Sequence, residues 1–208
     1  MSEMESPKAN NTPFSLEMFL RKVFKGVIDP VARFLLRIGL KPNMITGLGL
    51  ILTTGAAYFV ATGHMTLAGI ILVVAGPLDV VDGTMARMLG QPSPYGAFVD
   101  SVTDRCSELV LLCGLLYFYA VRSDALASIL VFLAAGGSVM VSYIKARAET
   151  LGYSAKTGIL TRVERLIVMA PCLIFNIPIV ALWIIAVLAN FTAIQRFVFV
   201  RRQAFLKK

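Results

Sequence analysis

The chain has 208 residues, of which 57% are hydrophobic and only 15% charged, and its mean hydropathy is +0.77. This composition excludes an ordinary soluble domain and is typical of an integral membrane protein. The net charge of +8 would suit nucleic acid, but the basic residues border apolar segments. We therefore expect membrane lipid headgroups and phosphates as partners, and no nucleic acid.

The first 13 residues are polar and lack the apolar core of a cleavable signal peptide, so we expect a disordered N-terminus. Residues 14–41 place apolar side chains at helical spacing against basic ones. This pattern predicts an amphipathic juxtamembrane helix, broken near Pro30, that lies along the lipid headgroups. A soluble helix packed on the rest of the domain is the alternative interpretation.

Residues 42–208 contain six apolar segments, which predict an all-α membrane domain with six transmembrane helices. The expected spans are residues 44–62, 66–88, 95–120, 125–149, 162–175 and 179–200. The fifth is the shortest, because about a dozen apolar residues follow Arg165, whereas a span needs about 17.

The basic residues indicate the orientation of these spans. With six spans, every one of the 20 Lys and Arg residues except Arg122 falls on one side or in the helix ends facing it. Such a bias marks the cytoplasmic side. We therefore expect a multi-pass protein of the cytoplasmic membrane, with both termini and the turn near residue 91 in the cytoplasm.

Four aspartates interrupt the second and third apolar segments: Asp79, Asp82, Asp100 and Asp104. Residues three or four apart share a helical face, and the Gly- and Pro-containing residues 89–95 reverse the chain between the two pairs. The sequence therefore predicts a square of carboxylates in an antiparallel hairpin, near the cytoplasmic face. Helix capping, or ion pairing with Arg87 and Arg105, is the alternative, although ionisable groups at membrane depth are usually functional.

The ligand chemistry of this cluster favours divalent cations and a phosphorylated substrate. Four carboxylates repel one another unless cations lie between them. Oxygen ligands without His or Cys suit Mg²⁺, Mn²⁺ or Ca²⁺ rather than Zn²⁺, and Mg²⁺ usually takes phosphate oxygens as further ligands. Gly83 and Ala86 leave room for a bulky ligand, and Arg87 offers its planar fork to a phosphate.

This segment resembles the complete signature of the CDP-alcohol phosphatidyltransferases. The matching positions are Asp79, Asp82, Gly83, Ala86, Arg87, Gly96, Asp100 and Asp104. The resemblance implies an enzyme in which an alcohol attacks the β-phosphorus of a CDP-lipid such as CDP-diacylglycerol and releases CMP. It implies two Mg²⁺ or Mn²⁺ ions at the four aspartates, with Asp79, Asp82 and Asp100 as metal ligands and Asp104 as the general base. It also implies a homodimer.

A shorter motif precedes the first span. Pro42, Asn43 and Thr46 resemble residues that family members carry near the nucleotide, although Asn43 is equally suited to capping a helix. The expected CDP-lipid-binding residues are Asn43, Thr46, Asp79, Asp82, Gly83, Ala86, Arg87 and Gly96.

A cationic cluster is expected at the loop between the fourth and fifth spans: Lys145, Arg147, Arg162 and Arg165. Cations beside an acidic metal site predict a pocket for an acceptor that carries its own phosphate. The alternative is that these basic residues only mark the cytoplasmic boundary of the membrane. The surrounding motifs are similar to those of family members that use inositol 1-phosphate to make phosphatidylinositol phosphate or its archaeal ether-lipid counterpart. Glycerol 3-phosphate, the acceptor of a phosphatidylglycerophosphate synthase, stays open, whereas serine would not need the cations.

Two other classes of protein use aspartates in membranes. Membrane prenyltransferases carry two separated Asp-rich motifs in longer chains, whereas this chain has one compact cluster. A divalent-cation transporter would need polar residues through the full bilayer, whereas the second and third segments are apolar beyond Asp79 and Asp104. An enzyme is therefore the favoured interpretation.

Overall fold

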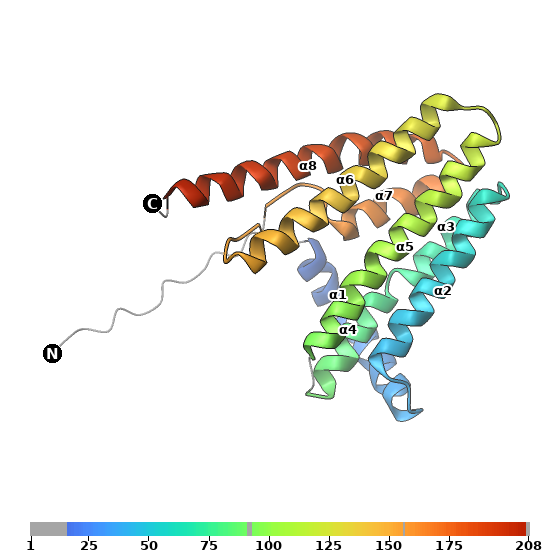
Figure 1. Ribbon diagram of the computed structural model, residues 1–208. Helices are drawn as coiled ribbons and strands as arrows, with labels where there is room; N and C mark the ends of the chain where they lie inside the picture. The colour runs from blue at the N-terminus through green and yellow to red at the C-terminus, as the bar shows by residue number, and fades with distance from the viewer. Residues whose placement is uncertain (1–15, 91–92, 156, 207–208) are drawn as a thin grey trace.

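The computed structural model describes residues 16–90, 93–155 and 157–206, and these residues form helices and short turns without a β-strand (Figure 1). The all-α prediction is confirmed for this part of the chain, whereas the expected disordered residues 1–13 lie outside it. The helices are α1 (Leu16–Arg37), α2 (Pro42–Ala61), α3 (Met65–Ala75), α4 (Leu78–Met88), α5 (Pro94–Ala120), α6 (Ala125–Thr150), α7 (Arg162–Ile174) and α8 (Pro178–Leu206).

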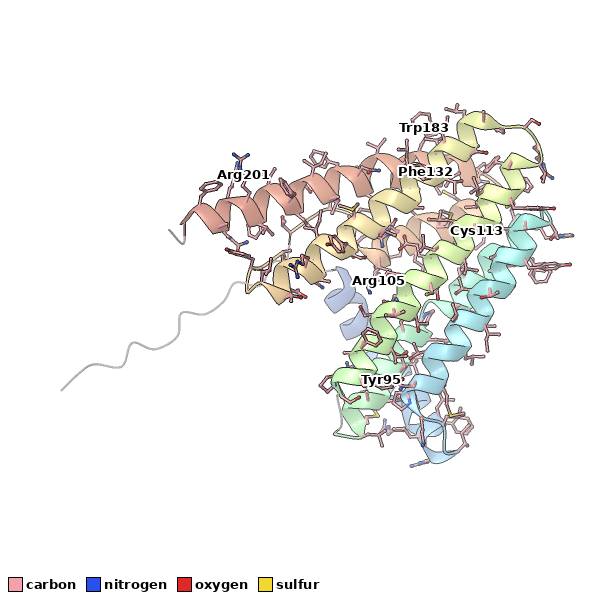
Figure 2. All side chains as sticks on the ribbon, viewed as in Figure 1. Tyr95, Arg105, Cys113, Phe132, Trp183 and Arg201 are labelled. Carbon is pink, nitrogen blue, oxygen red and sulfur yellow. The ribbon has the colours of Figure 1, made fainter. Side chains whose placement is uncertain are left out.

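Four helical stretches of the described residues are long and apolar enough to cross a bilayer: α2, α3 together with α4, α6 and α8. Large apolar side chains such as Phe132 on α6 and Trp183 on α8 project outward, as expected for surfaces that face lipid (Figure 2). The protein is therefore a multi-pass membrane protein. α5 is long, but its first half carries the aspartates, and α7 has only 13 residues.

The expected second span is divided by a break at Gly76 and Pro77, where α3 ends and α4 begins. Proline lacks the N–H that would continue the helical bonding, and its ring clashes with the preceding turn. At the same point α7 packs closely, because a Cβ on Gly76 would lie 2.6 Å from a methyl group of Leu166. The break therefore separates α4, which carries Asp79 and Asp82, from α3.

The prediction that the N-terminal helix breaks near Pro30 was wrong. α1 is continuous from Leu16 to Arg37 and contains Pro30. Ile28 and Ala32, on either side of the proline, are buried in a cluster with Val81 and Met85 of α4. This packing keeps α1 helical although the proline removes one backbone hydrogen bond.

The helices form two closely packed groups. α2 packs along α5 and α6 packs along α8, and the two groups are joined where α5 meets α6 and α3 meets α7 (Figure 1). Glycines permit the closest approaches. A Cβ on Gly114 of α5 would lie 2.5 Å from the carbonyl oxygen of Ala57 on α2. Small residues have this role at many helix contacts in membranes.

We expect Gly114→Ala to lower the free energy of unfolding by about 2 kcal/mol, because the added methyl group must push the α2 backbone away. Gly136→Ala is the matched control, since Gly136 is exposed on α6 and has no neighbouring atom within 4 Å of the new Cβ. The control should be neutral or slightly stabilising. Thermal unfolding in detergent measures both variants, and equal stability of the two would contradict the assignment of Gly114 to a tight helix contact.

Candidate functional site

The four aspartates lie beside a cavity, called the cleft below, whose lining includes Asp79, Glu108, Arg162 and Arg165. Asp79 and Asp82 lie on α4, and Asp100 and Asp104 lie on α5. α2 packs against both of these helices. Asp100 lies close enough to repel both Asp82 and Asp104 electrostatically. The cleft therefore concentrates negative charge in an apolar part of the chain.

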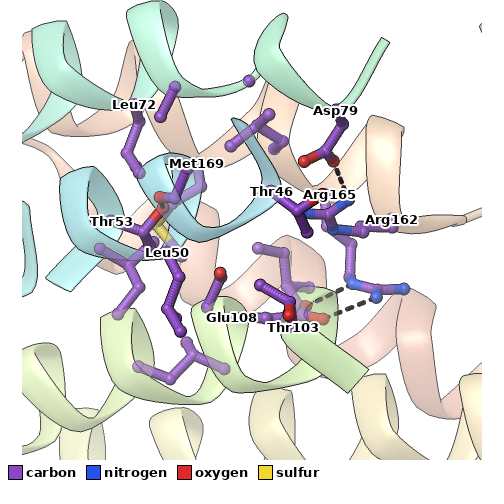
Figure 3. Close-up of a pocket in the computed structure, with 18 residues that line it drawn as sticks. Thr46, Leu50, Thr53, Leu72, Asp79, Thr103, Glu108, Arg162, Arg165 and Met169 are labelled. Atoms are coloured by element: carbon purple, nitrogen blue, oxygen red, sulfur yellow. Dashed lines mark hydrogen bonds and ion pairs between the residues drawn. The ribbon is translucent and has the colours of Figure 1, made fainter. Parts of the chain in front are cut away.

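A guanidinium from α7 bridges this cleft. Nη1 of Arg162 donates a hydrogen bond to Oδ2 of Asp79 (Figure 3). The same nitrogen contacts Oδ1 of Asp104 at 2.6 Å. The two carboxylates belong to different helices, so Arg162 joins α4, α5 and α7 at one point. The sequence placed Arg162 in the acceptor pocket and gave no sign of this bridge.

The first turn of α7 is fixed by a capping box. The carboxylate of Glu164 accepts a hydrogen bond from the backbone N–H of Thr161 at 2.8 Å and another from the Thr161 hydroxyl. Such a box satisfies free backbone groups at a helix start. It holds the residue before Arg162 in place and occupies the one carboxylate in this turn.

Arg165, one turn further along α7, forms a buried ion pair with Glu108 of α5. Nε and Nη2 of Arg165 contact Oε1 and Oε2 of Glu108 at 2.5 and 2.8 Å, and Arg165 is only 3% exposed (Figure 3). Nη1 also donates to the carbonyl oxygen of Leu160 at 3.3 Å. This two-point pairing fixes α7 against α5 beside the aspartates.

Several of the residues expected to bind the CDP-lipid contact one another. The Thr46 hydroxyl donates to Oδ2 of Asp82 at 2.6 Å and so orients that carboxylate. A Cβ on Gly96 would lie 3.8 Å from Oδ1 of Asn43, which brings the starts of α2 and α5 together. Gly83 faces the Arg87 side chain, whose Nη2 donates to the Thr84 hydroxyl at 2.8 Å.

Three other residues predicted to bind substrate take no part in the side-chain contacts with the aspartates described above: Ala86, Lys145 and Arg147. Ala86 is half-buried on α4. Lys145 and Arg147 are exposed in the last turns of α6 and, among the described residues, do not line the cavity beside the carboxylates. That cavity, of about 70 Å³, extends from Asp79, Arg162 and Glu108 into an apolar region near Leu72 and Met169.

The comparison with protein families decides which chemistry this cleft serves. Residues 40–198 match the family described as CDP-alcohol phosphatidyltransferase. The chain belongs to this family. The phosphatidyltransferase signature is thus distributed over α4 and α5, and the enzyme class expected from the aspartates is confirmed.

Curated relatives of this phosphatidyltransferase are more than one-third identical to it over most of its length. It is 37% identical to the phosphatidylinositol phosphate synthase of Streptomyces avermitilis, over 91% of the chain and 84% of that protein. It is 36% identical to the archaetidylinositol phosphate synthase of Pyrococcus horikoshii, over 85% of the chain and 92% of that protein.

Solved structures of the phosphatidylinositol phosphate synthase of Mycobacterium tuberculosis share the fold. One, with CDP-DAG bound, superposes with a TM-score of 0.78 at 31% identity, covering 84% of this chain and 93% of that one. A second, in complex with manganese and citrate, gives 0.79 at the same identity, covering 84% and 88%.

The donor set of the phosphatidyltransferase suits a divalent ion, but its present arrangement does not enclose one. Within residues 16–90, 93–155 and 157–206, no three acidic, His or Cys side chains converge tightly enough to hold a metal. The Arg162 guanidinium contacts both Asp79 and Asp104 and supplies positive charge there. The oxygen-only chemistry of the four aspartates fits Mg²⁺ or Mn²⁺.

Two residues beside the site escaped the sequence interpretation. Glu108 was not predicted as the partner of Arg165. Arg196 of α8 is buried and donates to the carbonyl oxygens of Thr157 and Val141 at 2.8 and 2.7 Å, which ties the α6–α7 loop to α8. The signal for Arg196 was available, because it is the single charged residue between Pro178 and Val200.

Proposed function

We propose that this enzyme transfers the phosphatidyl group of CDP-diacylglycerol to inositol 1-phosphate, giving phosphatidylinositol phosphate and CMP. The observation that carries this proposal is the position of the start of α7, where Arg162 contacts Asp79 and Asp104 and Arg165 lies one turn further along. An acceptor with its own phosphate needs cations beside the reaction centre, whereas a neutral or zwitterionic alcohol does not. The named functions of the relatives from Streptomyces and Pyrococcus support the inositol phosphate acceptor.

In this proposal Asp104 is the general base. The acceptor hydroxyl oxygen attacks the β-phosphorus, the bond from that phosphorus to the CMP oxygen breaks, and the hydroxyl proton passes to a carboxylate oxygen of Asp104. Asp104 is suited to this role because it lies on α5 between Asp100 and Glu108, the partner of Arg165. Thr46 holds the Asp82 carboxylate in one orientation.

The same aspartates would hold two divalent ions, which neutralise the pyrophosphate and the leaving CMP when bound. Asp79, Asp82 and Asp100 are the proposed ligands, and Asp104 completes the carboxylate set. The CDP-lipid would contact Asn43, Thr46, Asp79, Asp82, Gly83, Ala86, Arg87 and Gly96 around the end of the cleft. Lys145, Arg147, Arg162 and Arg165 would hold the phosphate of the acceptor.

We further propose the membrane arrangement expected from the sequence. Residues 42–208 form one domain with six crossings, in which α5 and the short α7 complete the four apolar stretches. α1 lies at the interface, since Val27, Val31, Phe34 and Ile38 are exposed beside basic residues while its other face packs on α4. The termini and the cleft face the cytoplasm, and the enzyme forms a homodimer.

The decisive assay offers purified protein CDP-diacylglycerol and Mg²⁺ or Mn²⁺ with one acceptor at a time and measures CMP release. We expect turnover with inositol 1-phosphate, and at least about tenfold less with free inositol or serine, because each lacks the phosphate that the cations hold. If the enzyme turned over only with glycerol 3-phosphate, that compound would be the acceptor in place of inositol 1-phosphate. Strong turnover with serine would refute the phosphorylated-acceptor proposal.

A further inference from the structure

We propose that Arg162 is an internal substitute for the divalent cation: its guanidinium bridges Asp79 and Asp104 in the metal-free enzyme and leaves them when metal binds. The inference rests on the proposed function for its second half, in which the displaced Arg162 becomes available to the phosphate of the acceptor. Arg162 would then determine the order in which the metal and the acceptor bind.

The geometry of the bridge carries the first step. One terminal nitrogen, Nη1, contacts a carboxylate oxygen of Asp79 on α4 and one of Asp104 on α5. Asp79 and Asp104 are members of the donor set that suits a divalent ion, and the guanidinium lies between them. If a divalent cation bound to these same oxygens, it would occupy the space of the Arg162 guanidinium, and the two positive charges would repel each other. The two states therefore exclude one another.

The surroundings of Arg162 allow it to move. Its side chain is 34% exposed, and it extends from the first residue of α7, just after the Thr161 cap. By contrast, Arg165 is 4% exposed at its side chain and is held at two points by Glu108. Since the capping box and the Arg165 pair fix the backbone of α7, the Arg162 side chain can change its partners while the helix stays in place.

The consequence is a linkage between metal and acceptor. Before metal binds, Arg162 is engaged by the aspartates and contributes little to binding a phosphate. After metal binds, the released guanidinium favours a phosphate beside the cleft. Linkage is reciprocal, so a phosphorylated acceptor must strengthen metal binding by the same factor by which metal strengthens binding of the acceptor. The acceptor would then bind productively only after the reaction centre is complete.

The test measures Mn²⁺ binding by calorimetry or by the paramagnetic signal of the free ion, in full-length protein without any acceptor. We expect Arg162→Gln to tighten Mn²⁺ binding by about fivefold or more, the lower end of the usual range for coupled sites. The variant should also lower the Tm of the metal-free protein, and saturating Mn²⁺ should remove most of that difference. Unchanged or weaker Mn²⁺ binding in Arg162→Gln would overturn the inference.

Arg105→Gln is the matched control. Arg105 follows Asp104 in the chain and interacts with it electrostatically. The guanidinium of Arg105, however, donates to the backbone carbonyl and the hydroxyl of Ser101 instead of bridging carboxylates. Arg105→Gln therefore removes the same charge from the same neighbourhood without opening the bridge. If Arg105→Gln tightened Mn²⁺ binding as much as Arg162→Gln, a general loss of positive charge would explain the result and the bridge would not.

A second measurement can be made on the wild-type enzyme, in which inositol 1-phosphate should tighten Mn²⁺ binding. Arg162→Lys should reduce this coupling, because an ammonium lacks the planar fork. Absence of coupling in the wild type would overturn the linkage to the acceptor. Failure of the proposed function gives a different pattern: no CMP release with inositol 1-phosphate, while Arg162→Gln still tightens Mn²⁺ binding.

Discussion

Asp104→Asn is expected to lower kcat by about 100-fold or more while leaving CDP-lipid binding largely intact, because general base catalysis contributes about 10² to 10⁴ in rate. Asparagine keeps the shape of the side chain, which is 19% exposed in the cleft, but cannot accept the hydroxyl proton. It also keeps one oxygen for the Arg162 contact. The measurements are CMP release under saturating substrates and binding of the CDP-lipid without acceptor.

Asp124→Asn is the control for this substitution. Asp124 caps α6 by accepting a hydrogen bond from the backbone N–H of Ala127 at 3.0 Å, and it lies in the turn between α5 and α6, beyond the end of α5 that is opposite the aspartates. Asparagine caps a helix as well as aspartate does, so activity and stability should be preserved. If CDP-lipid binding vanished together with turnover in Asp104→Asn, a separate role as base would be untenable.

Arg165→Met is expected to lower the free energy of unfolding by about 3 to 5 kcal/mol, the usual effect of removing one partner of a buried ion pair. Glu108, whose side chain is 18% exposed, would be left with an uncompensated charge among apolar residues. Removing both charges should be far milder, because an apolar pair of similar volume replaces the ion pair. We therefore expect Glu108→Leu combined with Arg165→Met to regain most of the lost stability.

This pair of variants also separates the structural role of Arg165 from its proposed role toward the acceptor. The double variant should fold well but show a raised KM for inositol 1-phosphate, with a smaller change in the KM for the CDP-lipid. Thermal unfolding in detergent and steady-state CMP release provide both numbers. A rise confined to the KM of the CDP-lipid would refute the assignment of Arg165 to the acceptor pocket.

The sequence determined the helical fold, the membrane environment and the enzyme family. Apolar segments of membrane length must satisfy their backbone polar groups internally, so they form helices whatever their neighbours. The spacing from Asp79 to Asp104 likewise depends on local helical geometry and fixed chemistry, and the family match over residues 40–198 agrees with it. The helix boundaries of α5, α6 and α7 fall within a residue of the predicted ones, because Pro94, Asp124 and Thr161 mark the helix starts locally.

Only the tertiary structure decided which partner each charged side chain has. Arg162 lies 83 residues along the chain from Asp79, and Arg165 lies 57 from Glu108, so no local spacing predicts either pair. The packing of α2 against both α4 and α5 depends on tertiary contacts, as does the continuity of α1 through Pro30. The reason is physical: helical periodicity fixes the face on which a side chain lies, whereas the distance between two faces is set by the volumes of the residues packed between them.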